Sequence, residues 1–196
     1  MQQNATGALG ILSEDSENAA TIAAAGAIPL LVRLLGAGSP AAVQQGAAGA
    51  LRTLSKHTEN VATIAAAGAI PLLVQLLGTG SEAGAQQSAA GVLSRIVLVE
   101  GSAPIARGVY IPSAATENVA TIVAAGAVPL LVQLLRPRSG ADTQLTATDA
   151  LSHLARFDEF AGTIAAAGAI PPLVHLLGPG SRADVRTAAT FGHLAA

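Results

Sequence analysis

One almost entirely apolar phrase occurs four times along the chain, and its first copy reads AAAGAIPLLVRLLGAGS. The copies begin at Ala23, Ala65, Val123 and Ala165. The run of leucine and valine in each copy is interrupted by one variable polar residue, which is Arg33, Gln75, Gln133 or His175. Because the apolar residues cover most of a helix circumference, the pattern predicts a helix packed on several sides, with the variable position facing water.

Glycine and proline divide each copy into two helices. The glycines are spaced by 42, 58 and 42 residues, at Gly26, Gly68, Gly126 and Gly168. We expect a short first helix that starts near an N-capping asparagine, at Asn18, Asn60 and Asn118. This helix would end at the glycine, which tolerates the left-handed conformation. A proline three residues later then opens the second helix, where its missing amide is harmless.

A third helix is predicted after each copy. Its N-cap would be a serine, at Ser39, Ser81, Ser139 and Ser181. Two of these serines resemble capping boxes, in the pairs Ser139/Asp142 and Ser181/Asp184. The third helix carries an apolar stripe at i, i+3 spacing, in the pairs Leu51/Leu54, Leu93/Ile96 and Leu151/Leu154. Three helices therefore make up a unit of about 42 residues.

These units predict one array over residues 1–196. Residues 1–17 match a third helix alone, because Gln2-Gln3 lies 42 residues before Gln44-Gln45. The full units would span 18–59, 60–117, 118–159 and 160–196, with an insertion of about sixteen residues near 96–113. Its Pro, Gly and single Tyr110 favour a loop with a short extended piece, either an ordered finger over the groove or a disordered excursion.

The period of about 42 residues, with a glycine between the first two helices and a proline at the start of the second, resembles the armadillo repeat. The resemblance covers essentially the whole chain except the insertion. The wording ENVATIAAAGAIPLLVQLL is most similar to arrays of plant and algal proteins, including the arms of U-box ubiquitin ligases and vacuolar-type armadillo adaptors. The resemblance implies an all-α, right-handed superhelix. Its third helices would line a concave groove that binds an extended peptide or a partner protein.

The resemblance also indicates which residues line the groove. In importin-α-like members an Asn on each third helix clamps the ligand backbone, and a Trp lies one turn earlier. The Asn register corresponds here to Ile11, Thr53, Arg95, His153 and His193, and the Trp register to Gly7, Gly49, Gly91, Asp149 and Ala189. With no Asn ladder and no Trp, nuclear-import cargo binding of that type is not expected.

Several of these polar positions are candidate binding residues. Arg95 is either a solvated cation or a partner for an acidic group. Two turns before the Asn register, Gln3, Gln45 and Gln87 either bond a ligand backbone or are exposed helix formers. The candidate groove residues are Gln45, Thr53, Gln87, Arg95, Asp149, His153 and His193.

Asp149 and His153 also suggest a second class of function, because an i, i+4 pair meets on one helix face. A hydrolase with these residues is the alternative hypothesis. This hypothesis is weak because the side chains of the adjacent Ser152 and His153 point about 100° apart around the helix. No feature of the sequence indicates an oxyanion site either. We expect no metal and no cofactor, since there is no cysteine and the four histidines do not converge.

The amino-acid composition limits the classes of partner that we expect. Half of the residues, 51%, are hydrophobic, yet 2% are aromatic and the net charge is −2, so no nucleic acid partner is expected. A membrane span at Val61–Leu77 is disfavoured by Gly68 and Pro71. We therefore expect a non-enzymatic scaffold in the cytoplasm, or alternatively the nucleus. The uncapped ends indicate a longer array or self-association. A U-box ligase arm is the alternative within binding.

Overall fold

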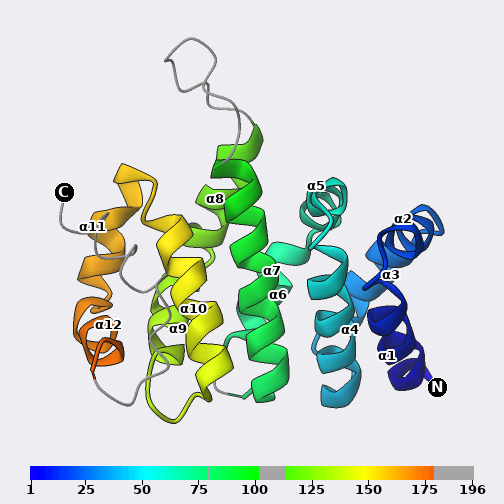
Figure 1. Ribbon diagram of the computed structural model, residues 1–196, viewed down its shortest axis with the longest axis horizontal. Coiled ribbons are helices and arrows are strands. Elements are labelled where there is room, and N and C mark those ends of the chain that lie inside the picture. The colour runs from blue at the N-terminus through cyan, green and yellow to red at the C-terminus, as the bar shows by residue number, and fades with distance from the viewer. Residues whose placement is uncertain (79, 102–113, 179–196) are drawn as a thin grey trace.

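The computed structural model describes residues 1–78, 80–101 and 114–178, which form helices joined by short turns (Figure 1). The helices are α1 (Gln2–Leu12), α2 (Ser16–Ala24), α3 (Ala27–Leu34), α4 (Ala41–Leu54), α5 (Thr58–Ala66), α6 (Ala69–Leu76), α7 (Ala83–Gly101), α8 (Ala114–Ala124), α9 (Ala127–Leu134), α10 (Ala141–Leu154), α11 (Asp158–Ala166) and α12 (Ile170–Leu176). No strand occurs in these ranges, and the all-α prediction is confirmed.

The helices repeat in threes, and every third helix lies in one row. α1 packs on α4, α4 on α7, and α7 on α10, so these four lie side by side in Figure 1. We call this surface the third-helix face. The intervening first and second helices form the other layer of the solenoid. The third helix predicted after α12 falls within residues 179–196 and lies outside the described residues.

Four glycines form the corner between the first and second helices, as predicted. Gly26, Gly68, Gly126 and Gly168 have φ angles of 75°, 78°, 83° and 80°. These left-handed values turn the chain sharply, and α5 and α6 meet at a bend of 92°. No single helix in the described ranges is long and apolar enough to cross a membrane. Two pairs of helices reach the length and apolar composition of a membrane span only when each pair is joined across such a bend. They are Thr58–Ala66 with Ala69–Leu76 and Glu117–Ala124 with Ala127–Leu134.

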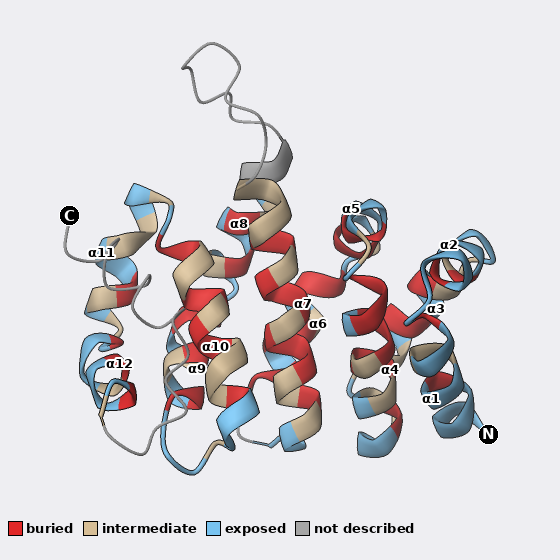
Figure 2. Cartoon of the chain, viewed as in Figure 1, coloured by how far each residue is buried: buried red, intermediate tan, exposed pale blue. Residues whose placement is uncertain are grey.

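The core runs between the two layers as a continuous buried strip (Figure 2). The predicted apolar stripe of the third helices is within it, since Leu51, Leu54, Leu93, Ile96, Leu151 and Leu154 are each at most 1% exposed. The variable polar position of the second helices is exposed in all four copies, at Arg33, Gln75, Gln133 and His175. The repeated phrase therefore encodes a buried scaffold helix with one solvent-facing position.

The predicted asparagine caps are wrong. α2 is capped by Asp15, whose Oδ1 accepts hydrogen bonds of 3.0 Å from the N–H groups of Glu17 and Asn18. Asn60 lies inside α5, is buried, and donates from Nδ2 to the carbonyl of Leu54 at 3.2 Å. Asn118 lies inside α8 and donates to Glu100. These two asparagines satisfy groups at the end of the preceding third helix, which local sequence cannot reveal.

The predicted serine caps are also wrong where the structure describes them. The N-cap residues of α4 and α10 are Pro40 and Gly140, and neither end has a side-chain cap. Each helix begins two residues after the serine, so the capping box of Ser139 and Asp142 does not form. The pair Ser181/Asp184 lies outside the described residues.

A repeated glutamine orders these corners in place of the serines. Gln44 donates from Nε2 to the carbonyls of Leu35 and Gly36, at 3.2 and 2.8 Å. Gln86 and Gln144 make the same pair of bonds one repeat and two repeats later. Each side chain satisfies carbonyls left open where the second helix ends. The recurrence of this glutamine near the start of each third helix is the sequence signal from which the contact could have been predicted.

The start of the insertion is helical, which corrects the predicted loop. α7 continues to Gly101, and Ile96 and Val97 are buried in it. Apolar packing extends the helix, because these side chains contact the neighbouring layer. The remainder of the insertion, with Tyr110 and the expected finger, lies outside the described residues.

Candidate functional site

A hollow of about 610 Å³ opens on the third-helix face, across α1, α4 and α7. Its walls include Gln3, Gln45 and Gln87, one glutamine from each helix and 42 residues apart along the chain. Gly7 and Gly49 leave open space above their helices, since an added Cβ at either would meet nothing within 4 Å. The hollow is therefore lined mainly by small residues and glutamine amides, with Glu14 and Arg52 as its charged side chains and without an aromatic residue among its described walls.

Other glycines set how closely the third helices approach. An added Cβ at Gly46 would overlap Thr6 of α1, and one at Gly84 would overlap Gln45 of α4. At Gly91, an added Cβ would lie 3.1 Å from Cδ of Arg52. Side chains of one helix thus lie across glycines of the next, which holds the helices close and places Gln45 and Arg52 on the face.

Three of the four predicted groove residues on the first three helices are brought together, and Arg95 is not among the residues that line the hollow. Gln45, Thr53 and Gln87 line the hollow with Gln3. Thr53 is 9% exposed and its Oγ1 donates to the carbonyl of Gly49 at 3.2 Å, so its hydroxyl proton is used within α4. Arg95 is partly exposed on α7, one turn beyond Gly91. The glutamine amides are the groups of this set that face the hollow.

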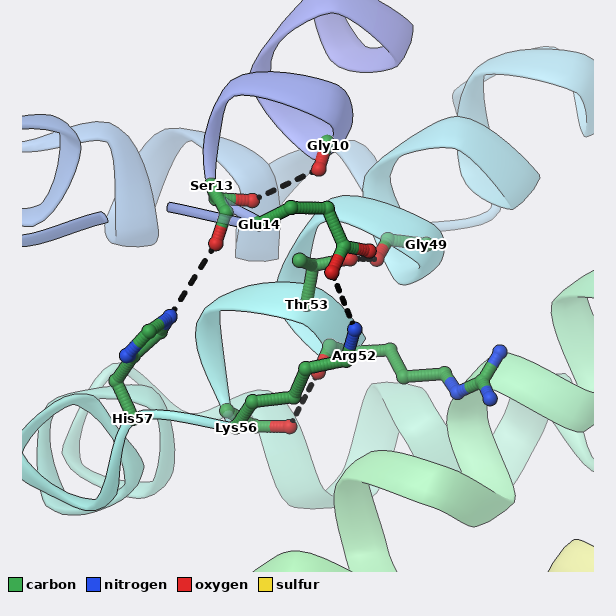
Figure 3. Close-up of polar contacts among 9 residues, drawn as sticks. Gly10, Ser13, Glu14, Gly49, Arg52, Thr53, Lys56 and His57 are labelled. Atoms are coloured by element: carbon green, nitrogen blue, oxygen red, sulfur yellow. Dashed lines mark hydrogen bonds and ion pairs between the residues drawn. The ribbon is translucent and has the colours of Figure 1, made fainter. Parts of the chain in front are cut away.

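Arg52 is a further residue of the face, and the sequence pattern did not single it out. It is exposed, lines the hollow, and extends toward α7, away from the polar cluster after α4 (Figure 3). Neither Arg52 nor Arg95 forms an ion pair within the described ranges. Arg52 lies one position before the Asn register. Only the glycine on the neighbouring helix shows that its side chain reaches across the face.

Polar contacts tie the edge of the hollow together (Figure 3). Lys56 Nζ pairs with Glu14 at 2.6 Å, and His57 Nε2 lies 3.3 Å from the carbonyl oxygen of Ser13. Ser13 Oγ in turn donates to the carbonyl of Gly10 at 3.0 Å. These contacts join the turn after α4 to the turn after α1, so the hollow has a defined edge before any partner binds.

Asp149 and His153 lie at the other end of the face, on α10. His153 Nδ1 is 3.0 Å from Ser94 Oγ, a contact between α10 and α7. Ser152 turns back on its own helix and donates to the carbonyl of Asp149 at 2.9 Å. Ser94 is only 7% exposed, which makes it a poor nucleophile for an external substrate. His193 lies outside the described residues.

The ionisable chemistry of the described residues is sparse. No group of three His, Asp or Glu side chains in them is placed to hold a metal ion. One carboxyl is perturbed: burial raises the pKa of Glu100 from its ordinary 4.5 to about 7. Hydrogen bonds from the Asn118 side chain and the Val119 backbone oppose this pKa shift. Glu100 is at the end of α7, outside the hollow.

Stacked helix triplets with one helix of each in a continuous row define an α-solenoid repeat protein. The family model for the Armadillo/beta-catenin-like repeat matches residues 15–56, 57–98 and 115–156. These matches cover more than half of the chain, which therefore belongs to the armadillo repeat family. No curated protein sequence matches it significantly.

Solved structures share the fold. An engineered protein is 29% identical, with a TM-score of 0.78 over 98% of this chain and 72% of its own. A designed armadillo repeat protein is 25% identical, with a TM-score of 0.74 over 98% of this chain and 73% of its own. Another, crystallised in complex with the peptide (KR)4, is 23% identical, with a TM-score of 0.76 over 98% and 74%. That last likeness shows the fold alone.

Proposed function

We propose that this chain is a non-enzymatic scaffold that binds an extended peptide, or an extended segment of a partner protein, along the third-helix face. The observation that carries the proposal is the hollow with Gln3, Gln45 and Gln87 at matching positions on three adjacent helices. A glutamine amide both donates and accepts hydrogen bonds. Three in a row can therefore pair with the backbone of a ligand whatever its side chains.

The spacing of the helices suits an extended ligand. Packed helices lie about 8–10 Å apart, and an extended chain advances about 3.3 Å per residue. Each helix of the row would then meet two to three ligand residues. The fold supports this mode, because a designed armadillo repeat protein of the same architecture was crystallised with a peptide. Armadillo repeats are typically binding scaffolds rather than catalysts.

Gly49 provides a test, because a side chain added there enters the hollow without meeting its neighbours. Gly49→Leu should fill the hollow, while Gly162→Leu adds the same side chain in open space on α11, away from the face. Peptides selected from a random display library with the unmodified protein should bind Gly162→Leu with unchanged Kd. They should lose at least about tenfold in affinity for Gly49→Leu, as expected when a well-packed contact is blocked.

Equal binding to both leucine variants would show that the peptide site lies elsewhere. Thermal melting of each variant verifies the fold. Leucine is a better helix former than glycine, so neither variant should melt below the unmodified protein.

Two narrower proposals follow from the sequence. The substrate-recognition arm of a U-box ubiquitin ligase is one, and a U-box coding segment in the same gene would test it. The cytoplasm, with the nucleus as the alternative, is the proposed location, which imaging of the tagged full-length product would test.

A further inference from the structure

Charged residues are few on the first three helices of the row, whereas α10 of the same row carries Asp142 and Asp149. Within α1, α4 and α7 the charged residues are Arg52, Arg95 and Glu100. The Glu100 carboxyl is half-buried at the end of α7, where Asn118 bonds it. Acidic residues gather instead in the first turns of the first helices, at Glu17, Glu59, Glu117, Asp158 and Glu159. Among the described residues, the hollow itself is lined by two charged side chains, Arg52 and Glu14, and Glu14 is already paired with Lys56.

The two arginines are placed to act together. The stem of Arg52 crosses from α4 and lies against Gly91 of α7. Arg95 is four residues beyond Gly91, and residues at i and i+4 share one face of a helix. Arg52 therefore reaches the stretch of α7 from which Arg95 extends. Neither is ion-paired in the described part of the chain, so both guanidinium groups can pair with carboxylates of a ligand.

We propose that the segment bound on the third-helix face is acidic, with carboxylates that pair with Arg52 and Arg95. The inference rests on the peptide-binding function proposed above and names the chemistry of its ligand. Arg52 and Arg95 belong to adjacent helices of the row, α4 and α7, which an extended ligand crosses in about two to three residues. A ligand with several carboxylates can therefore meet both guanidinium groups.

Guanidinium groups suit this role because they bind carboxylates in a bidentate manner. The glutamines of the hollow would bond the ligand backbone next to the pair. A basic ligand such as the (KR)4 peptide of the designed armadillo protein would be repelled by the same two side chains. The two arginines, rather than the shape of the hollow, would then select the partner.

The test compares three labelled octapeptides, (Glu-Ser)4, (Gln-Ser)4 and (Lys-Arg)4, by fluorescence anisotropy with the complete chain. We expect (Glu-Ser)4 to bind most tightly and to weaken as salt is raised. Arg52→Gln and Arg95→Gln should each reduce its affinity roughly fivefold at low salt. Arg52→Lys, which keeps charge and stem, should restore part of the loss. Arg33→Gln is the matched control, since Arg33 is an exposed arginine on α3 in the other layer.

Unchanged binding of (Glu-Ser)4 to the double variant Arg52→Gln/Arg95→Gln would overturn the inference, as would tighter binding of (Lys-Arg)4. The two proposals fail separately. If acidic peptides do not bind but library peptides bind in a manner sensitive to Gly49→Leu, the ligand is not acidic and the scaffold function stands. If no peptide binds, both proposals fail.

Discussion

Asn118 of α8 donates a hydrogen bond of 2.6 Å to Glu100 Oε1 at the end of α7. The second carboxyl oxygen of Glu100 is buried and has no hydrogen-bond partner among the residues that the structure describes. A proton on that oxygen removes the cost of burying a charge, which is why burial raises the pKa of Glu100 to about 7. The contact joins two helices on either side of the insertion.

This contact predicts a pH-dependent stability. The folded pKa of Glu100 lies above the ordinary 4.5, so the folded state binds the proton more tightly than the unfolded chain does. The contribution of Glu100 is therefore fully present below pH 4.5 and is lost as the pH rises to about 7. Glu100→Gln should remove this dependence, and at pH 8 it should be about 1 kcal/mol more stable than the unmodified protein, after allowance for solvent screening.

Urea unfolding of both proteins at pH 5 and pH 8 measures the difference. The gap in unfolding free energy between variant and unmodified protein should widen toward pH 8. A constant gap would show that Glu100 is ionised in the folded protein throughout this range.

The glutamine that bonds each corner should contribute to stability, whereas the glutamine that follows it in the first two corners should not. Gln86 Nε2 donates to the carbonyls of Leu77 and Gly78, at 3.4 and 2.7 Å, so Gln86→Ala leaves helix-end carbonyls without this partner. We expect a loss of about 1 kcal/mol in the free energy of unfolding. Gln87→Ala is the matched control on the hollow side, with an expected change within about 0.5 kcal/mol. Equal losses from both variants in urea unfolding would contradict this assignment.

Two asparagines at equivalent positions should also contribute unequally to stability. Asn60 is 4% exposed and bonds the carbonyl of Leu54, whereas Asn18 is exposed. Asn60→Ala should cost about 1–3 kcal/mol, because it leaves a carbonyl without its partner inside the protein. Asn18→Ala should be nearly neutral. Thermal melting of the two variants, each compared with the unmodified protein, tests the prediction. A neutral Asn60→Ala would mean that water replaces the bond.

Glycine to alanine substitutions at two sites should change the stability of the protein in opposite directions. Gly68 has a φ of 78°, so Gly68→Ala forces a side chain into the left-handed region and should cost about 1 kcal/mol or more. Gly49 lies inside α4 with open space around it, so Gly49→Ala should stabilise the helix by up to about 1 kcal/mol. The melting temperature of each variant, compared with that of the unmodified protein, tests this prediction. Shifts of both melting temperatures in the same direction would refute the conformational argument.

Much of this fold could be predicted because its determinants are local and repeated. The left-handed corner at Gly68 and the exposure of Gln75 follow from residue type and spacing within one copy. The hollow was foreseeable in part, since Gln45 and Gln87 occur at matching positions on successive third helices. The role of either glutamine in binding remains a prediction.

Other features depend on which groups meet across helices. An asparagine near a helix start is a cap when its oxygen faces its own first turn, but Asn60 instead finds the carbonyl of Leu54. Sequence spacing could not place the side chain of Arg52 against α7. That placement requires the close approach of α4 and α7 over Gly91.

The sequence by itself determined the repeat, its period and the family, because glycine, proline and apolar spacing act within a single unit. Only the tertiary structure decided which polar side chains satisfy the helix ends and which arginines of the third-helix face form no ion pair within the described residues. The physical reason is distance. A hydrogen bond or an ion pair forms between groups about 3–4 Å apart, and only the packing of neighbouring repeats brings such groups that close.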